Sequence, residues 1–211
     1  MTALLYINSH PLEAHESMSL TAAERFLEVY RDTRPEDEIV RLDLYRADVP
    51  ALDADVLRGW NALRSGAAFD DLPTEAKKKI ARLGEIVDQF LAADKFLIVS
   101  PMWNFSYPPV LKAYLDAVTA AGKTFRYTAE GPIGLATGRK AIHIQASGGV
   151  YGEGPAAAAD HGHRHLRAVL NFIGITDVER FGVEGHNQFP ERMSEIREQA
   201  LERAAALARI W

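Results

Sequence analysis

Short, continuous apolar runs alternate with longer segments of helical periodicity along this 211-residue chain. Apolar runs without polar alternation are typical of strands that are covered on both faces, as in a parallel sheet. The expected strands are residues 3–7, 38–43, 95–100, 141–146 and 177–183. The expected helices lie near residues 17–32, 75–92, 107–121, 155–173 and 190–209. Five strands alternating with five helices predict a doubly wound α/β sheet.

One long segment, residues 48–74, fits neither pattern, because two prolines and two glycines interrupt it. We interpret it as an excursion after the second strand that is partly helical. Loops of that length inside a compact domain usually have a function or form an interface. No repeat or low-complexity linker divides the chain, so residues 1–211 are expected to form a single domain.

The composition excludes several classes of protein. The chain has no cysteine, which rules out disulfide frameworks, thiolate metal sites and thiol catalysis. Its formal net charge is −5 and its one short basic run is residues 77–79, so we expect no nucleic-acid partner. No apolar stretch approaches the roughly 18–20 residues of a membrane span, and no basic leader precedes the first strand. A cytoplasmic protein with no membrane partner is expected.

The loop after the first strand carries hydroxyls beside the start of a helix. Ligands of doubly wound sheets bind outside the carboxyl ends of the strands, where the strand order reverses. Ser9, Ser17 and Ser19, with the free N–H groups of the helix, would form an anion site suited to phosphate. Simple N-capping by Ser17 or Ser19 is the alternative, and this loop alone does not decide between them. No P-loop and no GxGxxG motif is present.

The loop after the third strand is apolar and aromatic, running from Pro101 through Met102, Trp103 and Asn104 to Phe105. A planar aromatic ligand could lie against these side chains, with the amide of Asn104 at its polar edge. The alternative is a loop packed beneath the edge of the sheet.

The loop after the fourth strand has four glycines in seven residues, among them Gly148 and Gly149. Glycines permit close approach of the backbone to a ligand, and Tyr151 could stack on it, although a bare turn would also explain this loop. The three loops together predict a phosphate at the first loop and a flat ring between the other two.

Two further groups of residues carry weaker signals. His161 and His165 share a helix face, but no HExxH glutamate lies between them, so no metal site is expected. His186 and Asn187 follow the fifth strand and are candidate substrate contacts, while Glu184 is also a candidate for a dimer contact. A Gly-x-Ser-x-Gly motif of serine hydrolases is absent.

Several motifs in register from about residue 3 to 190 resemble the FMN-dependent NADH:azoreductases, relatives of the quinone reductases. They are residues 101–105, 122–128, 131–135, 138–141, 148–149 and 172–178. The resemblance implies a flavodoxin-like fold, with a five-stranded parallel sheet in a three-layer α/β/α arrangement.

The resemblance also implies that FMN is bound by three segments. Ser9, Ser17, Met18 and Ser19 match the positions around the phosphate. Pro101, Met102, Trp103, Asn104 and Phe105 match the segment around the isoalloxazine ring. Ala146, Ser147, Gly148 and Gly149 match the third segment, which we expect Tyr151 to extend. The family usually has Ser-Arg where this chain has Ala146-Ser147.

Members of that family are homodimers with the flavin near the interface, and Phe125 and Phe172 match positions that cover it. The implied chemistry is two-electron transfer from NADH or NADPH to a quinone or an azo compound in alternating half-reactions. No side chain acts as a nucleophile in that scheme, because the chemistry occurs at flavin N5. A dedicated quinone reductase is one alternative. A flavodoxin-like electron carrier or flavin-binding regulator without NADH turnover is another.

Overall fold

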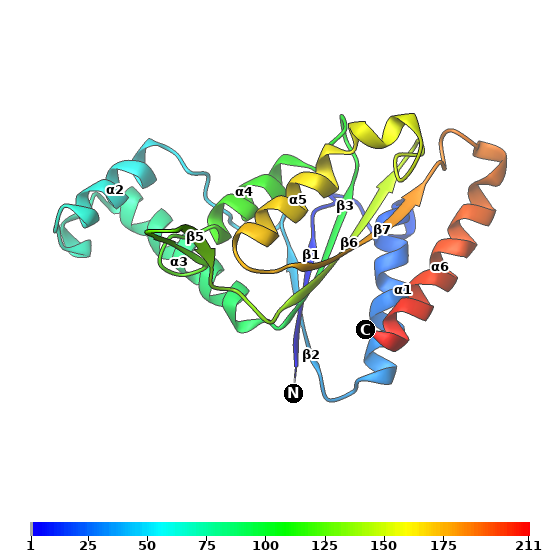
Figure 1. The fold of residues 1–211 in the computed structure, drawn as a ribbon, viewed down its shortest axis with the longest axis horizontal. Coiled ribbons are helices and arrows are strands. Elements are labelled where there is room, and N and C mark those ends of the chain that lie inside the picture. Colours follow the sequence, from blue (N-terminus) through cyan, green and yellow to red (C-terminus); the bar gives the residue numbers. More distant parts are fainter. Residues whose placement is uncertain (1) are drawn as a thin grey trace.

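The computed structural model describes residues 2–211, in which five parallel strands form one sheet of order β2-β1-β3-β6-β7 (Figure 1). These are β1 (Ala3–Asn8), β2 (Glu38–Asp43), β3 (Lys95–Pro101), β6 (Lys140–Ser147) and β7 (Asp177–Glu184). All five predicted strands are confirmed, each within one residue of its expected ends. The order reverses between β1 and β3, because the chain adds β2 on one side of β1 and the later strands on the other.

Helices cover both faces of the sheet, which gives the predicted three-layer α/β/α arrangement (Figure 1). One face carries α1 (Met18–Thr33) and α6 (Met193–Ile210). The other carries α3 (Thr74–Ala92), α4 (Pro109–Val118) and α5 (His161–Phe172). Each layer has its own apolar core, one on each side of the central strands.

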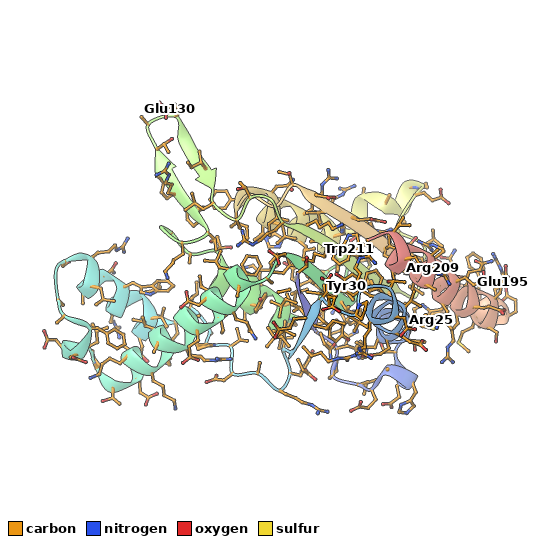
Figure 2. The ribbon with its side chains drawn as sticks, turned by 90° about the horizontal axis from the view of Figure 1, so that it is seen from below. Arg25, Tyr30, Glu130, Glu195, Arg209 and Trp211 are labelled. Atoms are coloured by element: carbon orange, nitrogen blue, oxygen red, sulfur yellow. The ribbon has the colours of Figure 1, made fainter. Side chains whose placement is uncertain are left out.

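Helices α1 and α6 pack closely because α6 presents small side chains. Ala200, Ala204 and Ala208 recur at helical spacing and are buried against α1. Figure 2 shows Tyr30 of α1 beside Trp211, whose ring centroids lie 6.1 Å apart. This contact holds the carboxyl ends of the two helices together, so the amino end of α6 lies with that of α1 at the carboxyl edge of the sheet.

The long excursion contains α2 (Ala54–Arg64), which packs on α3, and a 3₁₀ turn at Phe69–Asp71. Asp53 begins α2, because its side chain accepts hydrogen bonds from the next free backbone N–H groups. The partly helical interpretation of residues 48–74 is therefore confirmed.

The sequence did not predict one element, the antiparallel hairpin of β4 (Phe125–Thr128) and β5 (Gly131–Gly134). Its strands are four residues each, too short to show a period. Figure 2 shows the hairpin projecting from the body of the molecule, with Glu130 at its tip.

Two helices are shorter than predicted. Helix α5 begins at His161 because Asp160 caps it, and Pro155–Ala159 form a 3₁₀ turn instead. Helix α4 begins at Pro109, since a proline is tolerated in the first turn but lacks the N–H needed further in. No helix within residues 2–211 is long and apolar enough to cross a membrane.

Candidate functional site

A cavity of about 530 Å³ opens at the carboxyl edge of the sheet, beside the point where the strand order reverses. Ligand pockets of proteins commonly have about 300–1,000 Å³. Segments that follow β1, β3, β6 and β7 line it, together with the start of α6. The predicted site residues in its wall are Ser17, Met18, Pro101, Met102, Trp103, Ala146, Gly148 and Asn187.

The wall that follows β1 is the start of α1. Ser17 is the N-cap, and its hydroxyl accepts a hydrogen bond from the N–H of Leu20 at 3.4 Å and lies 3.1 Å from the Ser19 hydroxyl. The backbone N–H groups of Met18 and Ser19 have no acceptor within residues 2–211. Ser17 therefore caps α1. The free N–H groups of Met18 and Ser19 remain at the positive end of the helix dipole, so capping does not exclude an anion there.

The wall that follows β3 is a tight turn in which Asn104 and Phe105 have left-handed backbones, with φ of 49° and 67°. Trp103 and Ser106 close this turn with two backbone hydrogen bonds of 2.7 and 3.0 Å. The N–H of His161 donates to the carbonyl of Phe105 at 3.0 Å, so the first turn of α5 holds the loop. Non-glycine residues with positive φ are costly and persist at functional sites. The turn leaves Trp103, Asn104 and Phe105 exposed.

The part of the cavity wall that follows β6 contains Gly148, at a position that is tightly packed. A Cβ on Gly148 would lie 2.7 Å from Asn187 Nδ2, so no larger residue fits there without a shift. The N–H groups of Asn187 and Gln188 donate to the carbonyl of Gly148 at 3.1 and 2.9 Å. These two hydrogen bonds hold the segment after β7 against the glycine-rich loop. They thereby place Asn187 at the cavity. Tyr151 packs edge-on to Phe105, with ring centroids 6.2 Å apart.

Other predicted residues do not line the cavity. Ser9 and Ser19 are fully buried beneath it, and the Ser9 hydroxyl donates to the carbonyl of Val99 at 2.7 Å. Asn104, Ser147 and Gly149 each directly neighbour in the chain a residue that does line it, and Phe105 and Tyr151 lie further along the same two loops. They form its immediate surroundings.

Phe125 and Phe172 lie apart from this cavity. Phe125 is at the base of the hairpin and Phe172 is at the carboxyl end of α5, the end opposite the cavity. Their rings pack at 4.6 Å, and Phe172 keeps 37% of its surface exposed. Within one chain they form a separate aromatic patch with Tyr127, which is 74% exposed.

Sequence reasoning missed several lining residues. Those from the β1–α1 connection and from α6 are His10, His15, Glu16, Thr21, Met193, Ser194 and Arg197. The position of His10 directly after Ser9 was a usable signal, since every residue of that loop is near the strand end. The α6 residues gave no such signal in the sequence, because their position at the cavity depends on the packing of α6 on α1. His186, a candidate for substrate contact from the sequence, also lines the cavity.

Behind the aromatic turn lies a buried polar chain. The Ser100 hydroxyl is 2.9 Å from His143 Nε2, and His143 Nδ1 is 3.2 Å from His163 Nδ1. Burial lowers the pKa of His143 well below its usual value, and His163 and Arg180 act in the same direction. Nearby, the Tyr107 hydroxyl bonds to His165 Nδ1. No group of three or more potential ligands within residues 2–211 is arranged to hold a metal ion.

The residues present fit flavin mononucleotide. Free N–H groups at the start of α1 suit a phosphate, and the exposed Trp103 and Asn104 suit the face and polar edge of a ring. Gly148 lets the Asn187 side chain approach closely, so that both residues line the cavity. Ser147 stands where the family usually has an arginine. The cavity still has a cationic side chain, because Arg197 of α6 lies in its wall.

A parallel sheet in this order, with such a cavity at its switch point, defines a doubly wound nucleotide-binding protein of the flavodoxin type. The family model described as "Flavodoxin-like fold" matches residues 2–208. The chain belongs to that family.

Named relatives and solved structures are similar to this chain over nearly its whole length. The chain is 52% identical to the FMN-dependent NADH:quinone oxidoreductase of Bacillus pumilus, over 100% of both chains. It is 49% identical to FMN-dependent NADH:quinone oxidoreductase 2 of Bacillus subtilis, over 97% of each. Among solved structures, an azoreductase from Bacillus anthracis superposes with a TM-score of 0.92 at 38% identity, covering 100% of both chains. An FMN-dependent NADH-azoreductase of the same species in complex with FMN gives 0.88 at 34%, covering 99% and 100%. The resemblance inferred from the sequence is confirmed.

Proposed function

We propose that residues 2–211 form one FMN-binding domain that oxidises NADH and reduces quinones, with azo compounds as further acceptors. The observation that carries the proposal is the left-handed turn at Asn104 and Phe105. This turn holds the exposed side chains of Trp103, Asn104 and Phe105 beside the cavity. The start of α1, with its free N–H groups, lines the same cavity. Relatives named FMN-dependent NADH:quinone oxidoreductase, at about half identity over the whole chain, support the same function.

When bound, FMN supplies a two-electron carrier that accepts hydride from NADH and passes the electrons to the acceptor. The chain's own residues bind and orient. Ser17, Met18 and Ser19 would hold the phosphate, and Met102 to Phe105 the ring. Glycines 148 and 149 let the backbone reach the ring edge. Protons for the acceptor can come from water, so no side chain is assigned as a general acid.

A flavodoxin-like electron carrier is the second candidate, and the structure gives a reason to disfavour it. The excursion 48–74, the hairpin β4–β5 and the exposed Tyr127 and Phe172, which pack on the buried Phe125, are additions that single-electron exchange at a flavin edge does not need.

We further propose that the protein acts as a homodimer in the cytoplasm, where its donor NADH is held. The apolar patch on the hairpin and the end of α5 is separate from the cavity of its own chain. Ile133, which is 39% exposed, extends this patch along the hairpin. Exposed aromatic residues gathered in one place mark interaction surfaces. A second copy could set this patch over the cavity and complete its cover.

The function is tested by steady-state assay of the FMN-loaded protein with NADH, comparing a benzoquinone with an azo dye. We expect turnover with both and a higher kcat/KM for the quinone. If the protein retains flavin but does not oxidise NADH in the presence of either acceptor, the electron carrier is favoured. The same assay with NADPH determines the donor preference.

A further inference from the structure

Arg180 of β7 joins two carboxylates that lie behind the loops of the candidate site. Its Nε donates to Asp160 Oδ2 at 3.1 Å, and its Nη2 donates to Glu184 Oε1 at 2.5 Å. The side chains of Asp160, Glu184 and Arg180 are only 6%, 16% and 24% exposed. Because partly buried charges are screened little by water, these two ion pairs hold their geometry more firmly than exposed pairs do.

Two glycines leave room for this arrangement. Arg180, Gly182 and Glu184 share one face of β7, because alternate side chains of a strand point to the same side. Residues four apart on a strand are separated by about 13 Å, so the guanidinium must run along the strand to reach Glu184. A Cβ on Gly182 would lie 2.8 Å from Arg180 Nη1, and a Cβ on Gly152 would lie 2.8 Å from Glu184 Oε2. Both glycines therefore accommodate the ion pair.

The first carboxylate, Glu184, holds the glycine-rich loop (residues 148–154). Its Oε1 accepts a hydrogen bond from the N–H of Tyr151 at 3.2 Å, and its Oε2 accepts one from the N–H of Gly152 at 3.0 Å. Hydrogen bonds to an ionised acceptor are stronger than those between neutral groups. The position of Glu184 thus determines where this loop lies.

The second carboxylate, Asp160, holds the aromatic turn (residues 103–106) through helix α5. Asp160 Oδ1 accepts from the N–H of His163 at 3.1 Å and from Gln145 Nε2 at 3.3 Å, which fixes the start of α5. The first residue of α5, His161, donates its N–H to the carbonyl of Phe105 at 3.0 Å. A shift of Asp160 would therefore move the turn as well.

We propose that Arg180 is a positioning residue: by bridging Asp160 and Glu184 it sets the separation of the aromatic turn and the glycine-rich loop, and so the place of the flavin ring between them. The proposal rests on the proposed function, since it presumes that the ring lies at these two loops. Arg180 does not line the cavity and acts only through the two carboxylates. Without it, two partly buried like charges lose the cation that they share, which drives the two loops apart.

Two substitutions of Arg180 test this role. Arg180→Met keeps a long apolar side chain and removes every donor. Arg180→Lys keeps the charge, and one ammonium group can bridge two carboxylates, as Lys79 does with Asp53 and Asp55 at 2.6 and 2.8 Å in this chain. The lysine variant should therefore recover most of what the methionine variant loses.

Arg139→Met is the matched control. Arg139 is also half-buried, and its guanidinium donates to the backbone carbonyls of Ala93 and Leu91 at 2.8 and 2.7 Å. It directly precedes β6, so it lies at the edge of the sheet opposite the cavity. Its loss should affect neither loop.

The first measurement needs no flavin. Amide hydrogen exchange, followed by NMR on the flavin-free protein, reports how often each backbone N–H opens. In Arg180→Met we expect exchange about tenfold faster at Tyr151 and Gly152 of one loop and at His161, which holds the other. Arg180→Lys should return these rates toward those of the unsubstituted protein, and Arg139→Met should leave them unchanged.

The second measurement uses the flavin. Fluorescence titration of Arg180→Met should show the Kd values for FMN and for riboflavin, which lacks the phosphate, raised by the same factor, because the ring side of the site is disturbed. In protein saturated with FMN, the rate at which saturating NADH reduces the flavin should fall about tenfold or more, since small misplacements of reacting groups slow transfer strongly. A role in stability alone would leave that rate unchanged.

Three outcomes overturn the proposal. Faster exchange at one loop only, or at neither, means that Arg180 does not link them. A loss of affinity for FMN but not for riboflavin means that Arg180 serves the phosphate side. Unchanged reduction of the bound flavin in Arg180→Met means that the ring keeps its place without the bridge. If the unsubstituted protein binds neither flavin, the proposed function fails and the ring-positioning role with it, while the exchange rates still decide whether Arg180 links the loops.

Discussion

His143 and His163 face each other through their Nδ1 atoms at 3.2 Å, with rings stacked at 13° between their planes. His143 is fully buried, and its other ring nitrogen is paired with Ser100, one residue before Pro101 of the cavity wall. Only one hydrogen can lie between the two Nδ1 atoms, so at least one of the two rings must be neutral, and burial disfavours a charge on the other.

The first prediction is that stability falls on acidification through this pair. The folded-state pKa values of both histidines are lowered, chiefly by burial, while in the unfolded chain they are near 6.5. The native state then binds fewer protons, so its stability is intact above pH 6.5 and is lost as pH falls. Urea unfolding at pH 7.5, 6.5 and 5.5 should show a loss approaching about 1.4 kcal/mol per pH unit per histidine. His143→Gln should reduce the slope; an unchanged slope contradicts the assignment.

The second prediction concerns the amide of Asn104, whose backbone is left-handed with φ of 49°. Asn104→Gly keeps that conformation at no steric cost and removes the amide. We expect FMN affinity to fall about three- to tenfold with an unchanged melting temperature. Asn104→Ala should also lower the melting temperature, because alanine is strained there. Equal FMN affinity in the glycine variant would remove Asn104 from the binding site.

The third prediction concerns Gly148. Its replacement by alanine puts a Cβ 2.7 Å from Asn187 Nδ2 and so displaces the Asn187 side chain, which lines the cavity. FMN binding, followed by fluorescence, should weaken at least tenfold. Gly84→Ala is the control: Gly84 lies within α3 with no atom within 4 Å of a new Cβ. That change should leave FMN binding alone and raise stability by about 0.5–1 kcal/mol. Wild-type binding in the Gly148 variant would show that the close contact is dispensable.

The fourth prediction concerns Phe172, which is partly exposed and distant from the cavity of its own chain. Phe172→Ala should change the ratio of kcat/KM for quinone and azo acceptors more than it changes FMN content. Sedimentation of the same variant reports whether the proposed dimer persists. Loss of FMN with an unchanged acceptor ratio would mean that the residue supports the cofactor and not the acceptor.

The fold was predictable because each central strand is a continuous apolar run that is buried on both faces, as 95–101 illustrates. The hairpin β4–β5 was not, because four-residue strands outside the sheet leave no periodic signal. The start of α5 was misplaced by six residues since the alanines after Pro155 favour helix, whereas the Asp160 cap sets the boundary.

The candidate site was predictable to the extent that it follows from strand ends. Ser17, Trp103 and Gly148 line one cavity because the carboxyl ends of parallel strands share an edge. Met193 and Arg197 reach the cavity only through the packing of α6 on α1. Neither contact has a pattern in the sequence.

The most direct test of the account is an anaerobic absorbance spectrum of the protein after reconstitution with FMN and desalting. The account predicts a retained flavin band that bleaches when NADH is added and returns when a quinone follows. A retained band that NADH leaves untouched would contradict the proposed enzyme and favour an electron carrier. Complete loss of the band on desalting would contradict flavin binding itself.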